Sequence, residues 1–171
     1  LAIVPLIDGR KVLDVGSGAG LPGIPLAIHF DDRAFVLLDS NGKKTRFLTQ
    51  VCIDLALSNV EVVQSRVEEY VGSFEQVVCR AFASLDSIAA SCSHLLTENG
   101  SLLAMKAQQE AIEDAGSLVI EAMTELKVPL LDAQRWAIEL MNRPCQEFLP
   151  LRTRKAVSVK PPPASILRRH W

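Results

Sequence analysis

The amino-acid sequence predicts an α/β domain in which helices cover both faces of a mostly parallel, seven-stranded β-sheet. Short segments rich in β-branched and aliphatic residues alternate with longer segments of helical period. This alternation is typical of parallel strands joined by helical crossovers. The pattern then changes, because residues 126–131 and 135–141 are two apolar stretches separated by a short turn. That change predicts a C-terminal antiparallel hairpin.

The alternating part predicts five strands and four helices. The expected strands cover residues 11–15, 34–39, 61–64, 76–80 and 101–106. The expected helices cover residues 24–29, 43–57, 85–96 and 109–123. No secondary structure is predicted for the last thirty residues, which hold several prolines.

Two local patterns support the helix assignments. In the second helix, spacing places four apolar side chains on one face: Phe47, Leu48, Val51 and Leu55. After the third helix, the pair Asn99-Gly100 is a natural helix end.

Length and composition fit one domain with a core of its own. The chain has 171 residues, of which 49% are hydrophobic and 22% charged. We expect a cytoplasmic location, because there is neither an apolar run of about 18 to 20 residues nor a secretory leader. We also expect a monomer. The four cysteines form no Cys-x-x-Cys pair and the three histidines are scattered. Neither a disulfide framework nor a metal site is therefore predicted.

Charge is distributed unevenly along the chain. The last 20 residues hold six of the 18 Lys and Arg residues and none of the 20 Asp and Glu residues. A basic segment of this kind either attracts phosphate groups or is simply solvated. We expect a domain over residues 1–143 and a basic, proline-containing tail over residues 144–171.

The stretch LDVGSGAGLPGIP after the first strand is the most informative part of the sequence. Gly16, Gly18 and Gly20 come directly after the strand's carboxyl end. Without a Cβ atom, the backbone there can turn sharply and lie directly against a ligand. The sequence therefore predicts a cofactor crevice.

Two kinds of cofactor fit a glycine-rich loop in this position. Gly18-x-Gly20-x-x-Gly23 satisfies the dinucleotide pattern, which leaves a nicotinamide-dependent oxidoreductase as an alternative. In a dinucleotide site, however, the first glycine follows the strand at once. Here that glycine is Gly16, and the third place in its pattern falls on Leu21.

Two carboxylates bear on the same choice. Asp14 at the strand's end would repel a pyrophosphate and would suit the ammonium group of S-adenosylmethionine. Asp39, at the end of the second strand, is placed either to accept hydrogen bonds from ribose hydroxyls or to act as a carboxylate at a helix N-terminus. The methyl donor is favoured.

Four stretches resemble those of a known family, in its order and with its spacing: LDVGSGAGLPGIPLAI, LLDSNGKKTRFL, VVQSRVEEY and VCRAFASL. The family is that of the 16S ribosomal RNA guanine-N7 methyltransferases, once called glucose-inhibited division protein B. The resemblance runs from about residue 12 to residue 107 and continues more weakly to about residue 140. It implies a Rossmann-like class I fold, S-adenosylmethionine as cofactor, and 16S ribosomal RNA or the small ribosomal subunit as substrate.

The resemblance also implies which residues hold the cofactor, and all of them follow strand ends, where open α/β sheets bind ligands. Glu68 would accept a hydrogen bond from the adenine amino group, whereas neighbouring Glu69 is interpreted as an exposed carboxylate. With the rest of the glycine-rich loop, the expected set is Asp14, Gly16, Ser17, Gly18, Gly20, Leu21, Asp39, Val67, Glu68 and Arg80.

The implied reaction needs no general base, since guanine N7 carries a free lone pair and no proton. No catalytic residue is therefore predicted, and Arg80 is expected to position cofactor or substrate. As a charged group after an apolar strand, Arg80 is also expected to need a partner. An Asn-Pro-Pro-Tyr motif, which amino-group methyltransferases use, is replaced by residues 80–84. Cys145, which follows a proline as in cytosine C5 enzymes, is interpreted as incidental.

RNA contacts are predicted at basic residues near the crevice: Lys43, Lys44, Arg46 and Lys106. A solvated helix face explains the first three equally well. Phe82 is expected either to stack on the target base or to belong to the core. Since the family's N-terminal helical segment is largely missing, a cofactor- and RNA-binding module without catalysis is the second alternative.

Overall fold

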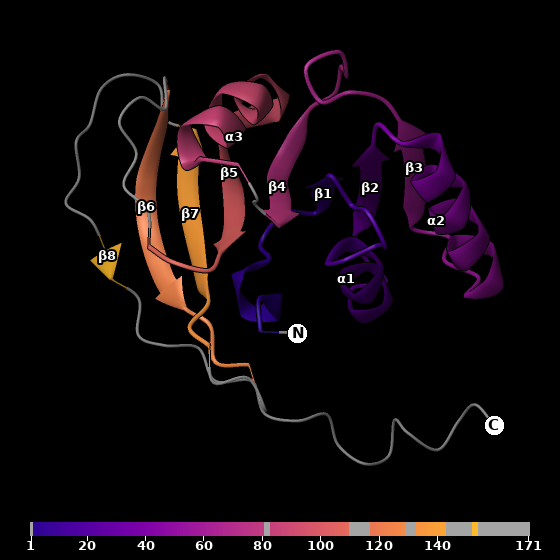
Figure 1. Cartoon of the computed structure of the whole chain (residues 1–171), viewed down its shortest axis with the longest axis horizontal. Helices are drawn as coiled ribbons and strands as arrows, with labels where there is room; N and C mark the ends of the chain where they lie inside the picture. Colours follow the sequence, from indigo (N-terminus) through magenta and orange to yellow (C-terminus); the bar gives the residue numbers. More distant parts are fainter. Residues whose placement is uncertain (1, 81–82, 110–116, 129–132, 143–151, 154–171) are drawn as a thin grey trace.

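The computed structural model places the strands in a single sheet with the order β3-β2-β1-β4-β5-β7-β6-β8 (Figure 1). It describes residues 2–80, 83–109, 117–128, 133–142 and 152–153. The strands are β1 (Lys11–Val15), β2 (Ala34–Asp39), β3 (Val60–Gln64), β4 (Phe74–Arg80), β5 (Leu96–Lys106), β6 (Leu118–Glu125), β7 (Trp136–Asn142) and β8 (Arg152–Thr153). The helices are η1 (Val4–Leu6), α1 (Gly23–His29), α2 (Gly42–Asp54), α3 (Leu85–Cys92) and η2 (Ser93–Leu95).

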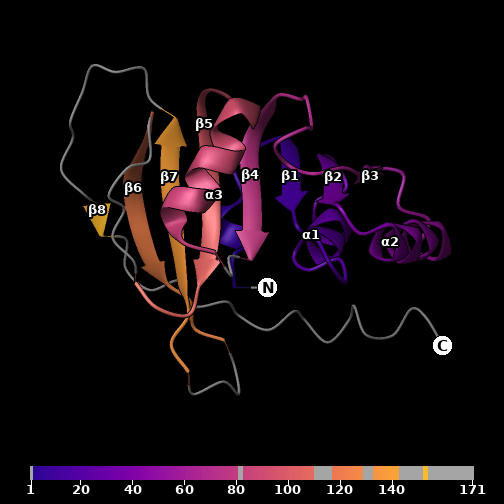
Figure 2. The same ribbon diagram turned by 45° about the horizontal axis from the view of Figure 1, so that its top comes forward.

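Strands β3, β2, β1, β4 and β5 are parallel, and β7 runs antiparallel between β5 and β6. Figure 2 shows the arrow of β7 pointing against those of its neighbours. The predicted fold class is therefore confirmed: seven strands form the expected sheet, and two-residue β8 adds to its edge. None of the described helices is long and apolar enough to cross a membrane.

Helices cover both faces of the sheet because its central strands present apolar side chains on both sides. Val12 of β1 packs with α1 and the N-terminal segment, whereas Leu13 packs with α3 on the other face. Helix α2 joins α1 on the first face through the contact of Leu48 with Ile24 and Leu37. Successive residues of β1 thus serve different layers, and Asp14 falls on the α1 face.

The buried face of α2 differs from the predicted one. Leu48 and Cys52 are buried, together with Thr45. Phe47 and Leu55 lie outside the core, with 51% and 49% of their surface exposed. The spacing correctly indicated a helix, but sequence does not tell which side of the apolar stripe meets the sheet.

The predicted helix end at Asn99-Gly100 is wrong. Helix α3 ends at Cys92, and β5 already begins at Leu96. Asn99 has a φ of 62°, and the register of β4 and β5 shifts where the pair occurs. Asn tolerates this left-handed backbone in an irregular strand as readily as at a helix end.

The predicted helix over residues 109–123 is also wrong in its described part, because residues 118–123 belong to β6. The hairpin exists, but its first strand lies about eight residues earlier than expected. Leu126, the first residue of the predicted strand 126–131, extends the ladder beyond β6: its N–H donates to the Arg135 carbonyl at 2.7 Å. Residues 110–116 and 129–132 lie outside the described part of the chain.

A buried glutamine fastens the N-terminal segment to the sheet. Gln76 is fully buried on β4; its Oε1 accepts hydrogen bonds from the N–H groups of Asp8 and Gly9, and its Nε2 donates to the Leu6 carbonyl. These contacts bring Ile3 into the core on the α1 face.

Replacing Gln76 with Leu should lower the free energy of unfolding by about 1–3 kcal/mol, because three backbone groups, two of them in buried hydrogen bonds, lose their partner. Urea denaturation would measure the change. As a control, Gln50→Leu on the exposed surface of α2 should change it by less than about 0.5 kcal/mol. Equal effects of the two substitutions would contradict this role for Gln76.

Candidate cofactor and substrate site

The glycine-rich loop between β1 and α1 contains one glycine that faces open space and another that is packed against α1. Gly16 and Gly20 have φ angles of +68° and +85°, in the left-handed region that favours glycine. A Cβ atom added to Gly16 would meet no atom within 4 Å, whereas one added to Gly20 would lie 2.6 Å from Cγ1 of Ile24. Gly16 therefore offers its backbone to open space, and Gly20 lets the loop pack on α1.

Three cavities meet at Gly16, each at the carboxyl ends of parallel strands. The large cavity, of about 630 Å³, lies toward β5 and the hairpin. The α3 cavity, of about 210 Å³, lies between the loop and α3. The β2 cavity, of about 440 Å³, lies between the loop, the end of β2 and the segment after β3. Their size and position are those of a small-molecule site in an open α/β sheet.

Most of the predicted cofactor residues line these cavities: Gly16, Gly18, Leu21, Asp39, Val67, Glu68 and Arg80. They come from the ends of β1, β2, β3 and β4, which the parallel sheet brings to one edge. Two predicted RNA-binding residues, Lys44 and Lys106, line the large cavity as well.

Asp39 is held in place by the loop and still borders the β2 cavity. Its Oδ2 accepts the Gly18 N–H at 3.0 Å and lies 3.5 Å from Lys44 Nζ, and its Oδ1 accepts the Asn41 N–H at 2.9 Å. A carboxylate has about four acceptor positions, and backbone groups take two of them. Asp39 can therefore also accept hydrogen bonds from ligand hydroxyls.

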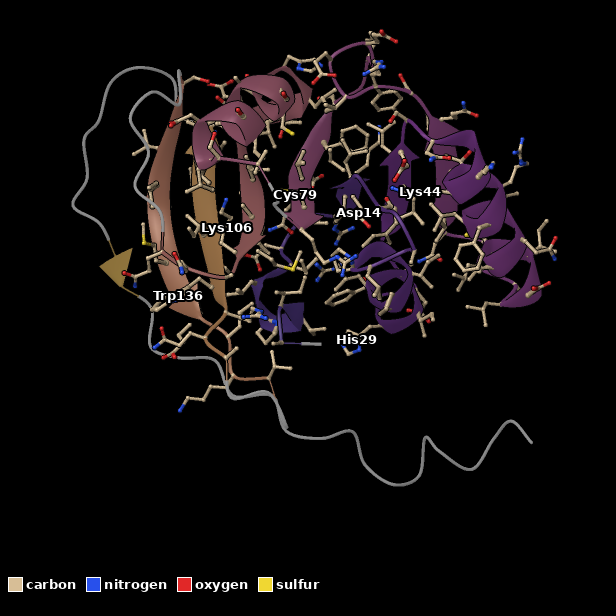
Figure 3. The ribbon with its side chains drawn as sticks, viewed as in Figure 1. Asp14, His29, Lys44, Cys79, Lys106 and Trp136 are labelled. Atoms are coloured by element: carbon tan, nitrogen blue, oxygen red, sulfur yellow. The ribbon has the colours of Figure 1, made fainter. Side chains whose placement is uncertain are left out.

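Asp14 is fully buried, and none of the three cavities is lined by it. Its Oδ2 accepts the N–H of Gly23 at 2.9 Å, while Oδ1 has no hydrogen-bond partner among the described residues. Burial raises the pKa of this carboxyl to about 7, although the Gly23 hydrogen bond and the positive charge of Arg80 oppose the shift. Figure 3 shows Asp14 between Lys106 of β5 and Lys44 of α2.

Ser17, like Asp14, lies beneath the loop. It is fully buried, and its hydroxyl donates to the Asp14 carbonyl at 2.8 Å. Of the predicted cofactor residues, Asp14, Ser17 and Gly20 thus support the loop from behind and do not line the cavities.

Arg80 stands where the large cavity and the α3 cavity meet. The expected burial of Arg80 is wrong, because the residue is exposed, although its positive charge does act on Asp14. Lys106, across from it, donates from Nζ to the Ala83 carbonyl at 2.6 Å. Both cations therefore face the same opening from neighbouring strands.

The other predicted RNA contacts are not part of this opening. Lys43 and Arg46 are exposed on α2 and line none of the three cavities. Phe82 lies outside the described residues.

Sequence reasoning missed several lining residues. Arg66 borders the β2 cavity two residues after β3. The family resemblance implied only its neighbours Val67 and Glu68, but the position of Arg66 near a strand end was a signal for it as well. Arg135, Met105 and Ile3 line the large cavity, but only tertiary packing brings them there.

Two cysteines border the α3 cavity without the character of nucleophiles. Burial raises the pKa of Cys92 to about 12 and that of Cys79 still further. Both thiols therefore stay protonated near neutral pH, which disfavours a covalent thiolate mechanism at this site. Cys145 lies outside the described residues.

Comparison with known proteins decides the family. The model of the GidB family, described as rRNA small subunit methyltransferase G, matches residues 1–138. The chain belongs to this family. Its members named ribosomal RNA small subunit methyltransferase G include a protein of Hydrogenovibrio crunogenus, 49% identical over 86% of this chain and 69% of its own length. Another, from Nitrosococcus oceani, is 48% identical over 84% of this chain and 69% of its own length.

Solved structures support the fold. A predicted O-methyltransferase from Agrobacterium tumefaciens aligns with a TM-score of 0.69 at 17% identity, over 86% of this chain and 79% of its own. A SAM-dependent methyltransferase from Aquifex aeolicus aligns with a TM-score of 0.61 at 13% identity, over 77% of this chain and 81% of its own. The expected Rossmann-like methyltransferase fold and the family are therefore both confirmed.

The raised pKa of Asp14 predicts a pH-dependent stability. The folded chain keeps this proton up to about pH 7, whereas the unfolded chain releases it near 3.8. Between those values the folded state binds more protons, so the contribution of Asp14 to stability falls as pH rises and levels off above pH 7. Relative to Asp14→Asn, which cannot titrate, the unaltered chain should be more stable at pH 5 than at pH 8.

Urea unfolding of both chains at the two pH values measures this difference. Asp31→Asn, in an exposed turn, controls for the change in net charge. A stability difference that is the same at pH 5 and pH 8 would show that Asp14 does not titrate in this interval.

Proposed function

We propose that this chain transfers a methyl group from S-adenosylmethionine to N7 of a guanine in 16S ribosomal RNA. The observation that carries the proposal is the junction of three cavities at Gly16, in a chain that belongs to the rRNA small subunit methyltransferase G family. One part of this junction suits a nucleoside, and another suits an anionic substrate. Membership of a methyltransferase family favours the methyl donor over a nicotinamide cofactor.

The residues present fit S-adenosylmethionine. The open backbone at Gly16 and Gly18 leaves room for its amino acid part, and Asp39 can accept hydrogen bonds from its ribose hydroxyls. Val67 and Glu68 border both smaller cavities and offer the adenine an apolar contact and an acceptor. Bound there, S-adenosylmethionine supplies an electrophilic methyl group on its sulfonium sulfur.

The protein's own contribution to the reaction is positioning. Guanine N7 needs no base, so the site must hold the purine in line with the donor. Arg80, exposed between the large and α3 cavities, is placed to contact donor and acceptor together. Lys44 and Lys106 add positive charge around the large cavity, where RNA phosphates would bind.

The wider assignments rest on the same reasoning. We propose that residues 1–143 form the methyltransferase domain and that the basic residues of the tail, 144–171, add contacts to phosphate. The proposed partner is 16S ribosomal RNA or the small ribosomal subunit. We propose that the chain itself is a monomer and acts in the cytoplasm.

The decisive measurement is methyl transfer from labelled S-adenosylmethionine to small ribosomal subunits or to their RNA, with mapping of the modified nucleotide. We expect one N7-methylguanine, together with binding of the donor in calorimetry. Donor binding without incorporation would support the alternative of a binding module without catalysis. Binding of NADH without binding of the donor would overturn the proposal.

Glu68 and Glu69 form a matched pair for testing the adenine contact. Glu68 borders the cavities and Glu69, its exposed neighbour, does not. Losing one acceptor costs about 1–2 kcal/mol, so Glu68→Ala should weaken binding of S-adenosylhomocysteine by about 5- to 30-fold. Glu69→Ala should leave the dissociation constant and the melting temperature unchanged. Equal affinities of the two variants would remove Glu68 from the cofactor site.

A further inference from the structure

The large cavity extends beyond the residues that the proposed cofactor uses. Its outer wall is the hairpin subsite, which we define by Ile3 of the N-terminal segment, Met105 of β5, Leu126 at the end of β6, and Arg135 just before β7. None of these residues belongs to the glycine-rich loop or follows β2 or β3. The subsite is therefore available to a second ligand.

Arg135, the cation of this subsite, has its backbone held by the β6–β7 ladder. The Arg135 carbonyl accepts the Leu126 N–H at 2.7 Å, so its backbone continues the β6–β7 ladder. The guanidinium donates to the Gln134 carbonyl at 2.7 Å, which leaves most of its N–H groups for other acceptors. Since Lys106 pairs with Trp136 across the β5–β7 ladder, Arg135 and Lys106 lie beside each other at the same end of the sheet.

The charge around the cavity is of one sign. Four cations line it, Lys44, Arg80, Lys106 and Arg135, and the described residues that line it include no Asp or Glu. Lys44 is already paired with Asp39, whose Oδ2 lies 3.5 Å from its Nζ. The four cations together still favour an anion at this opening. Ile3, Met105 and Leu126 supply the apolar part of the hairpin subsite. An apolar floor within a ring of cations matches a nucleotide, whose base is flat and apolar on its faces and whose phosphate is anionic.

We propose that the hairpin subsite binds the target nucleotide of the RNA, turned out of its stack, and that Arg135 contacts the phosphate beside it. The inference rests on the proposed function and deepens it by assigning a residue to the RNA. An enzyme that acts on a base must bring the reacting atom next to its cofactor, and enzymes of this kind act on single-stranded nucleic acid or turn the target base out of its stack. The subsite adjoins Gly16 and Arg80 in one cavity, so a base held there would lie next to the donor.

The test compares Arg135→Gln with Lys127→Gln. Lys127 carries the same charge on the opposite arm of the hairpin, just after β6, but it is exposed and does not line the cavity. Loss of a charge-assisted phosphate contact should weaken binding of the RNA by about tenfold or more. It should also reduce the slope of log affinity against log salt by about 0.7, the value for one contact to a single strand. Lys127→Gln should change neither, and Arg135→Lys should restore the slope.

Binding of S-adenosylhomocysteine is measured with the same preparations and should be unchanged in all variants, which shows that they are folded. If Arg135→Gln and Lys127→Gln bind RNA alike, or if affinity falls while the salt slope stays the same, the inference is overturned. If the unaltered chain neither binds nor methylates the RNA, it is the proposed function that fails.

Discussion

The site depends on the close approach of α1 to the ends of β1 and β2. A Cβ atom at Gly23 would lie 2.2 Å from Cδ2 of Leu37 and 2.6 Å from Oδ2 of Asp14, so only glycine allows the contact. The hydrogen bond from the Gly23 N–H to Asp14 fixes it. The chain must then reverse direction within a few residues, which requires the left-handed backbone at Gly16. The open space at Gly16 is thus a consequence of the packing of Gly23 against Leu37 and Asp14 beneath the loop.

A second constraint joins the loop to its neighbour strand. The N–H groups of Gly16 and Ser17 donate to the Leu38 carbonyl, and the Gly18 N–H donates to Asp39. Asp39 therefore shapes the loop and borders the β2 cavity at once. Residues below this layer are buried and hold it in place, and residues above it line the cavities. The same sequence motif contains both kinds, and conformation alone separates them.

Much of this arrangement followed from the sequence because its causes are local. Strands β1 to β4 are apolar runs bounded by turns. The glycine-rich loop and Asp39 were predicted from the ends of β1 and β2, whereas Val67, Glu68 and Arg80 were implied by the family resemblance. Asp14 was expected to face the cofactor because its position at the strand's end was known. The sequence did not show which face of the sheet Asp14 is on; the structure places Val12, and by alternation Asp14, on the α1 face.

What could not be predicted depends on contacts distant in sequence. Residues 118–125 hold apolar side chains at spacings that suit a helix as well as a strand, and the pairing with β7 decides between them. With β6 misplaced, the turn that carries Arg135 could not be brought to the large cavity. Ile3 likewise reaches that cavity only because Gln76, more than sixty residues away, fastens the N-terminal segment. Arg66 differs, since it needed only the strand-end rule.

The charged residues also show that position in the fold matters more than a property of the whole sequence. A net charge of −2 gives no indication of a polyanionic partner. The fold nevertheless gathers Lys44, Arg80, Lys106 and Arg135 around one cavity from four separate elements. Because a local cluster governs the potential within a Debye length of about 8–10 Å, the acidic residues elsewhere on the surface are largely screened from a phosphate at this opening. If the proposed RNA contacts lie at this opening, they depend on where the parallel strands and the hairpin end more than on the overall charge.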